Sequence, residues 1–124
     1  MDYAIGTGAQ ISSNSWGANS AGFSEYLNTS LEAVQDTHLF VAAAGNDGRL
    51  IGAPNLPWFT CNVNAANQIC VASSNPQGTK SHFSNWSKEL VHVFAPGTDI
   101  YSTYPVALRS YSYLSGRVRF HVTI

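Results

Sequence analysis

The residues of this chain best suited to chemistry end an apolar segment, residues 39–48, which reads LFVAAAGNDG. The apolar run is typical of a strand buried on both faces of a parallel sheet, and its Gly-Asn-Asp-Gly end predicts a sharp turn. Ligands of open α/β sheets bind at the carboxyl ends of strands. There the side-chain amide of Asn46 could donate hydrogen bonds to an oxygen that becomes negative. On these residues alone, an ordinary Asn turn after a buried strand explains the segment equally well.

The elements that precede this segment predict what lies beside Asn46. A short strand is expected at residues 10–13, followed by a helix that ends near residue 37. With the strand that starts at Leu39 they form a strand–helix–strand unit, whose two strands run parallel. The small-residue loop 14–20 and the turn at Asn46 should therefore leave the sheet at the same edge, on either side of a cleft. The helix is predicted from apolar residues at spacings of three and four, namely Phe23, Tyr26, Leu27, Leu31 and Val34.

The rest of the chain predicts more short strands and thus an α/β fold with a mainly parallel sheet. Glycine and proline punctuate this part, with a turn at Asn75-Pro76-Gln77-Gly78 and the end of a strand at Ala95-Pro96-Gly97. The further segments are a helix end at 2–8, a surface loop at 52–67, strands at 69–72 and 91–94, and a short extended segment at 100–103, whereas residues 111–114 simply lead into Ser115 and Gly116.

Four segments, taken in order, resemble the subtilases, the subtilisin-like serine endopeptidases. They read GAQISSNSWG, LFVAAAGNDG, NQICVASSNPQGTKSHFSNW and VHVFAPGTDIYST. The resemblance covers nearly everything from residue 2 to residue 116, and four ordered matches are far more specific than any one of them. It implies a partial three-layer αβα fold, truncated at both ends, in which residues 1–116 are the central part of a peptidase domain.

The resemblance also implies roles for particular residues. In this family a serine attacks the peptide carbonyl, a histidine takes its proton and an aspartate orients the histidine. Asn46 matches the asparagine that helps to hold the oxyanion, so it is the catalytic candidate. Trp16 matches a substrate-binding position, and a core aromatic is the alternative for it. The implied substrate-binding residues are Ser15, Trp16 and Gly17, which pair with substrate backbone, and Ala43, Ala44 and Gly45, whose small side chains leave room for a large apolar side chain.

The three triad residues of the family have no match in this chain. The family's Asp and His motifs lie upstream of the matched segment, and the nucleophile should follow Gly116 in Gly-Thr-Ser. Here Arg117 and Val118 follow instead, and residues 117–124 continue without resemblance. We therefore expect this tail to reflect a frame shift, a retained intron or a misplaced exon boundary, and the chain alone to be inactive. His38, His82, His92 and His121 stand in no nucleophile or metal motif; His38 is expected at a helix C-terminus, and His82 and His92 at the surface.

Cys61 and Cys70 fit no zinc pattern, so they form either a local disulfide or two free thiols. Because the family is usually exported, the resemblance favours the disulfide and a secreted or secretory-pathway location, although no signal peptide starts the chain. Asn28-Thr29-Ser30 and Asn85-Trp86-Ser87 are formal glycosylation sequons. We predict no cofactor and no metal site; calcium is possible in a full-length parent, and Glu89 falls near one family calcium region, without a ligand cluster.

Composition excludes several other classes of function. The 124 residues fit one domain, and 44% hydrophobic with 10% charged residues supports a packed core. A net charge of −1 offers no basic surface for nucleic acid, and no apolar run reaches the roughly 20 residues of a membrane span. The expected partner is therefore a peptide or protein substrate. Two alternatives are a truncated, non-catalytic peptide-binding protein and a nucleotide-binding unit, either at Gly6 and Gly8 or at Gly45 to Gly48. The third glycine of the nucleotide fingerprint is missing, and Gly8 precedes a strand instead of a helix.

Overall fold

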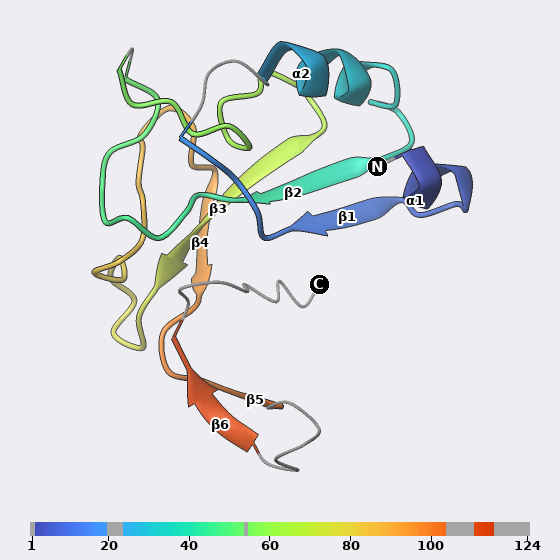
Figure 1. Cartoon of the computed structure of the whole chain (residues 1–124). Helices are drawn as coiled ribbons and strands as arrows, with labels where there is room; N and C mark the ends of the chain where they lie inside the picture. Colours follow the sequence, from blue (N-terminus) through green and yellow to red (C-terminus); the bar gives the residue numbers. More distant parts are fainter. Residues whose placement is uncertain (1, 20–23, 54, 104–110, 116–124) are drawn as a thin grey trace.

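The computed structural model of this protein describes residues 2–19, 24–53, 55–103 and 111–115, and shows a parallel sheet with a separate hairpin (Figure 1). The phenylalanine at position 23 and the tail 117–124 lie outside the described residues. The helices are α1 (Asp2–Gly6) and α2 (Ser24–Glu32), and the strands are β1 (Ile11–Asn14), β2 (Leu39–Ala43), β3 (Gln68–Ser74), β4 (Val93–Pro96), β5 (Ile100–Thr103) and β6 (Tyr111–Leu114).

The main sheet has the order β1-β2-β3-β4, and every neighbouring pair is parallel. The parallel crossover predicted from sequence is confirmed, because β1 and β2 pair directly and α2 lies between them in the chain. The register sets Asn14 opposite Ala42 and Ala43 opposite Val71. The mainly parallel α/β fold class is therefore confirmed as well.

The hydrophobic core lies on one face of this sheet, under α2. Leu27 and Leu31 of α2 join a buried cluster that includes Phe40 of β2. Because side chains alternate along a strand, Ala42 and Ala44 follow Phe40 on the same face, while Val41 points to the other. Both kinds of position are buried, which accounts for the uninterrupted apolar run of β2.

A disulfide joins Cys61 to Cys70, with their Cα atoms 5.4 Å apart, inside this core. The pairing favoured from the resemblance is thus the one that the structure contains. It ties the end of the loop 52–67 to the middle of β3, so the loop is anchored against the sheet.

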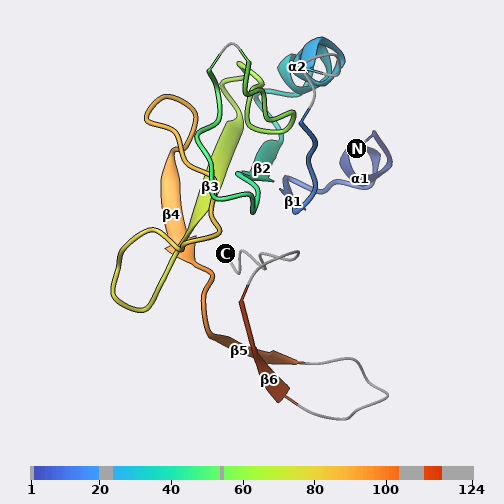
Figure 2. The same cartoon turned by 60° about the vertical axis from the view of Figure 1, so that its left-hand side comes forward.

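The strands β5 and β6 form an antiparallel pair that projects away from the main sheet (Figures 1 and 2). Tyr101 of β5 lies across from Tyr113 in the register, and its ring stacks on that of Tyr111, with ring centroids 5.6 Å apart. The segment 100–103 was expected to be extended, but neither a strand at 111–114 nor the pairing of the two segments was predicted.

Some expected boundaries were wrong, for local reasons. The strand expected at 91–94 is β4, which starts at Val93 and includes Ala95 and Pro96. Because β4 ends the strand order of the part of the chain that the structure describes, Pro96 lies on an edge strand, where the missing N–H of a proline is tolerated. The helix expected to reach residue 37 ends at Glu32, after which Val34 and Gln35 donate to carbonyls three residues back, as in a tightened last turn.

His38 follows the last turn after α2, as expected, and its N–H donates to the carbonyl of Val34 at 3.0 Å. The side chain is buried: its Nδ1 lies 2.9 Å from the carbonyl oxygen of Ala9, and its Nε2 lies 2.9 Å from Oγ of Ser12. His38 thus links the start of β2 to β1 by filling both of its hydrogen-bonding positions. Its contacts are structural.

Candidate functional site

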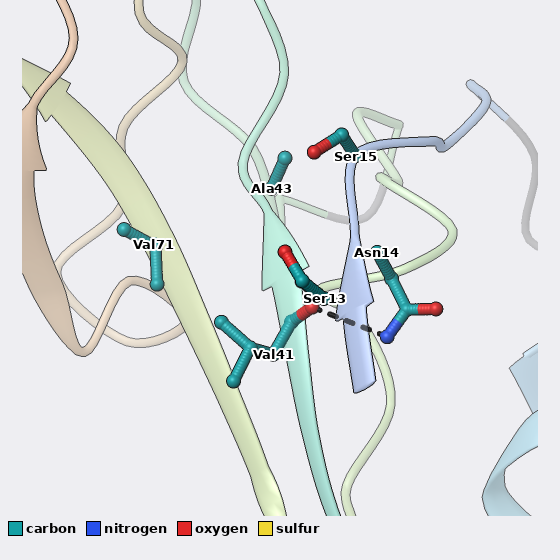
Figure 3. A pocket seen from close by; sticks show the side chains of 7 residues that line it. Ser13, Asn14, Ser15, Val41, Ala43 and Val71 are labelled. Carbon is teal, nitrogen blue, oxygen red and sulfur yellow. Dashed lines mark hydrogen bonds between the residues drawn. The ribbon is translucent and has the colours of Figure 1, made fainter. Parts of the chain in front are cut away.

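The predicted site lies where β1 and β2 leave the sheet. Because these strands are parallel neighbours, the segment after Asn14 and the turn after Ala43 emerge at the same edge, as the sequence predicted. Figure 3 shows Ser13 on β1 and Ser15 just after it on one side of Ala43, and Val71 of β3 on the other. They line a cavity of about 10 Å³ on the face opposite the core, which has room for about one water molecule. The structure therefore brings the two predicted substrate segments together.

Asn46 follows directly in the turn after β2. The backbone at Gly45 has a φ of 95°, which lets the chain reverse sharply before Asn46. The Asn46 side chain is half-buried, and its Oδ1 is buried without a hydrogen-bond partner among the described residues. Because this oxygen is unpaired within that part of the chain, the backbone of the turn sets where the Asn46 side chain lies.

The wall formed by Ala43, Ala44 and Gly45 is held from the loop 52–67, which sequence reasoning treated only as a surface loop. Trp58 donates from Nε1 to the carbonyl of Ala43 at 3.0 Å, and Thr60 donates to the same oxygen at 3.3 Å. The aromatic residue in a Pro-rich loop was the only available signal. Satisfying a strand-end carbonyl in this way stabilises the site wall.

Trp58 also explains why two of the predicted substrate-binding positions are glycines. A Cβ on Gly17 would lie 2.9 Å from Nε1 of Trp58, and one on Gly45 would lie 2.5 Å from its Cζ2. Small residues at these two positions accommodate the indole ring. The indole ring therefore occupies the space next to these two glycines, and the room expected beside Ala43, Ala44 and Gly45 for a large apolar substrate side chain stays a prediction.

Trp16 combines the two interpretations given to it. Its ring packs edge-on against Phe40, at a centroid distance of 6.2 Å, and against Phe59 at 5.6 Å. Its Nε1 donates to Oδ1 of Asn14 at 3.2 Å, and the side chain remains 50% exposed. One side of the ring thus extends the core, while the other faces solvent next to Ser15 and Gly17.

The second sequon has a different role from the one that its pattern suggests. Asn85 is fully buried, and its Nδ2 donates to the carbonyl of Ala44 at 2.9 Å, so this amide is not accessible to a glycan in the folded chain. Sequence reasoning missed its contact with the Asn46 turn. Asn28, in the first sequon, lies on α2 and donates to Glu32.

The remaining titratable candidates are dispersed. Nδ1 of His92 accepts a hydrogen bond from the backbone N–H of Cys70 at 2.9 Å, whereas His82 packs edge-on against Phe83. His121, Arg117 and Val118 fall outside the described residues. Over residues 2–19, 24–53, 55–103 and 111–115, no group of three or more His, Cys, Asp or Glu side chains could hold a metal ion. In the same residues, no helix is long and apolar enough to cross a membrane.

Comparison with protein families decides what this arrangement belongs to. The model of the subtilase family matches residues 1–119. The chain belongs to the subtilase family. Thermitase of Thermoactinomyces vulgaris is 39% identical to this subtilase chain over 118 residues, 94% of the chain. Subtilisin-like protease 4 of Arthroderma gypseum is 41% identical over 86 residues, 68% of the chain. The chain spans only 38% and 20% of these two relatives.

Solved structures show the same fold. The structure of the prenylagaramide maturation protease PagA matches 93% of this subtilase chain with a TM-score of 0.73 and 25% identity. The patellamide maturation protease PatA matches 93% of it with a TM-score of 0.72 and 27% identity. The chain covers 40% and 41% of those two structures. The partial sheet described above is thus a portion of a larger subtilisin-like fold in these neighbours.

Proposed function

We propose that this chain is the part of a subtilisin-like serine endopeptidase that supplies Asn46 to the oxyanion hole. The observation that carries the proposal is the position of Asn46, in a sharp turn directly after β2, at the sheet edge where the segment after β1 also emerges. During attack on a peptide carbonyl, the carbonyl oxygen becomes an oxyanion. The Nδ2 of Asn46 would donate a hydrogen bond to it, and a fixed donor lowers the barrier because it needs no reorganisation.

The substrate in this proposal is an extended segment of a peptide or protein. The residues Ser15, Trp16 and Gly17 follow β1, which ends the strand order of the sheet. An extended peptide could therefore pair with this backbone as an added strand. A location in the secretory pathway is consistent with the disulfide between Cys61 and Cys70.

The chain by itself should not hydrolyse peptides. The sequence has Val118 where the family's nucleophile belongs, and a valine side chain cannot form an acyl intermediate. The expected result is no release of product from a fluorogenic peptide and no labelling by a fluorophosphonate. Subtilisin-like protease 4 of Arthroderma gypseum serves as the positive control. Covalent labelling of this chain at a serine would overturn its proposed inactivity.

The role of Asn46 is tested in an active host. Residues 9–97 of this chain replace the matching segment of the Arthroderma gypseum protease, and kcat and KM are measured with and without Asn46→Ala. We expect kcat to fall by about 10²–10³, the loss known for removal of one oxyanion-hole donor in a subtilisin, an enzyme of this same family. Asn75→Ala, in a turn elsewhere, is the control. An unchanged kcat in the Asn46→Ala graft would refute the proposed role.

A further inference from the structure

The side chain of Asn85, in a segment distant in sequence, forms hydrogen bonds with the turn that carries Asn46. Oδ1 of Asn85 accepts hydrogen bonds from the backbone N–H groups of Asp47, at 2.9 Å, and Arg49, at 3.2 Å. Its Nδ2 donates to the carbonyl of Ala44, at 2.9 Å, and lies 3.3 Å from Oδ2 of Asp47. The Asn85 amide thus bonds the backbone on both sides of Asn46, and all of these partners are 36 to 41 residues away in sequence.

The backbone around Asn85 reinforces this grip. The N–H of Asn85 donates to the carbonyl of Gly45 at 3.0 Å, and the N–H of Gly48 donates to the carbonyl of Phe83 at 2.7 Å. Trp86 in turn donates to the carbonyl of Arg49 at 3.0 Å. The segment 83–86 therefore runs beside the whole turn, and the turn has little freedom to shift alone.

Asn85 is in turn linked to β3 through the hydroxyl group of Ser84. The carbonyl of Asn85 accepts a hydrogen bond from Oγ of Ser84 at 3.0 Å, and the same Oγ accepts from the N–H of Ser73 in β3 at 2.9 Å. Asn85, Ser84 and Ser73 are all 0% exposed. Buried polar groups that are fully paired rigidify their surroundings, so Asn85 connects the turn rigidly to β3.

We propose that Asn85 is a positioning residue for the oxyanion hole, which holds the Asn46 amide where the oxyanion forms. This inference rests on the proposed function of Asn46. Asn46 has a side-chain oxygen without a described partner, so its aim is set by the turn, and the turn is set by Asn85. Asn85 touches neither substrate nor reacting atoms in this role. Gly45 is needed for this contact, because a Cβ at its position would lie 2.5 Å from Nδ2 of Asn85.

The test is a double-mutant cycle in the grafted protease, with Asn85→Ala, Asn46→Ala and the two combined. We expect Asn85→Ala to lower kcat by about 10- to 100-fold, as displacements near 1 Å do, and to leave KM nearly unchanged. In the Asn46→Ala background, Asn85→Ala should have little further effect, because the donor that it positions is gone. Asn85→Asp, which keeps an acceptor but loses the donor to Ala44 and adds charge beside Asp47, should also lower kcat.

Asn75→Ala is the matched control, because Oδ1 of Asn75 likewise accepts from two backbone N–H groups, those of Gln77 and Thr79. It should leave kcat within about twofold of the unsubstituted graft, since it lies outside the gripped turn. A second readout needs no activity: in the chain itself, hydrogen exchange of the Asp47 and Arg49 amides should accelerate at least tenfold in Asn85→Ala and not in Asn75→Ala.

The outcomes separate the two levels of the argument. If Asn46→Ala lowers kcat but Asn85→Ala lowers it equally in both backgrounds, Asn85 is merely structural and the inference fails while the proposed function stands. Unchanged exchange of the Asp47 and Arg49 amides in Asn85→Ala would also overturn the inference. If Asn46→Ala leaves kcat unchanged, the proposed function fails, and the positioning role fails with it.

Discussion

In two turns of this molecule, one Asn side-chain oxygen accepts hydrogen bonds from two backbone N–H groups. The turns differ in whether that Asn lies within the turn or in a distant segment. In the turn after β3, Oδ1 of Asn75 accepts from two backbone N–H groups two and four residues ahead. In the turn after β2, Oδ1 of Asn85 accepts from two backbone N–H groups nearly forty residues away. The first turn is exposed and self-contained, whereas the second is clamped by a fully buried side chain. Only the second carries a residue with a proposed chemical role.

The difference shows how a turn can become a fixed part of a site. A local Asn turn selects a backbone shape but leaves the turn free to move as a unit relative to the sheet. A contact from another segment removes that freedom, and burial raises the penalty of losing it, because unpaired buried donors are costly. The turn after β2 is therefore suited to hold a donor at one position, and the turn after β3 is suited only to reverse the chain.

The glycines of the two turns should give the largest contrast. Gly45 and Gly78 both have positive φ, of 95° and 76°. A Cβ added at Gly45 would lie 2.5 Å from atoms of Trp58 and Asn85, whereas a Cβ added at Gly78 would have no atom within 4 Å. Gly45→Ala should lower the free energy of unfolding by about 4 kcal/mol, from backbone strain plus overpacking. Gly78→Ala should cost about 1 kcal/mol, from the left-handed backbone alone. Urea unfolding of the chain measures both, and equal losses would break the comparison.

The two asparagines come next in expected size. Asn85→Ala empties a fully buried position and leaves the part-buried N–H groups of Asp47 and Arg49 without their acceptor, so we expect a loss of about 2 kcal/mol. Asn75→Ala exposes its two N–H groups to water, which can replace the lost bonds, and should cost about 0.5 kcal/mol. The urea unfolding midpoints of the two variants, compared at equal m-value, measure the two losses. A loss in Asn75→Ala as large as that in Asn85→Ala would show that burial does not separate the turns.

The same contrast explains how far sequence could be used to predict this structure. The turn at Asn75 was predicted because Asn-Pro-Gln-Gly carries its own signal, and the parallel sheet was predicted because β2 is apolar throughout. The place of Asn46 followed from the end of β2. The contacts of Asn85 could not be predicted, because a hydrogen bond across about forty residues leaves no periodic pattern. The formal sequon around Asn85 says nothing of these contacts.

Other features escaped prediction for the same reason. The indole of Trp58 bonds to Ala43 and fills the space at Gly17, yet the sequence shows only an aromatic residue in a loop. The side-chain contacts of His38 were not predicted because only its neighbours in sequence were considered, whereas its partners are on β1 and just before it. Local signals thus predicted elements and turns, and the long-range polar contacts that set the site emerged only from the fold.

The smallest expected effect comes from the indole hydrogen bonds of two tryptophans, Trp58 and Trp16. Nε1 of Trp58 donates to the carbonyl of Ala43, beneath the Asn46 turn, and Nε1 of Trp16 donates to Oδ1 of Asn14 in a more exposed place. Trp58→Phe removes a donor from a part-buried carbonyl that Thr60 also serves, so the loss should be about 1 kcal/mol. Trp16→Phe exposes its acceptor to solvent and should cost a few tenths of a kcal/mol. The two variants are compared by urea unfolding and by hydrogen exchange of the Asp47 amide. If Trp58→Phe accelerated exchange of the Asp47 amide as much as Asn85→Ala does, the position of the turn would depend on the contact between Trp58 and Ala43. It would then not depend mainly on the hydrogen bonds from residues 83–86.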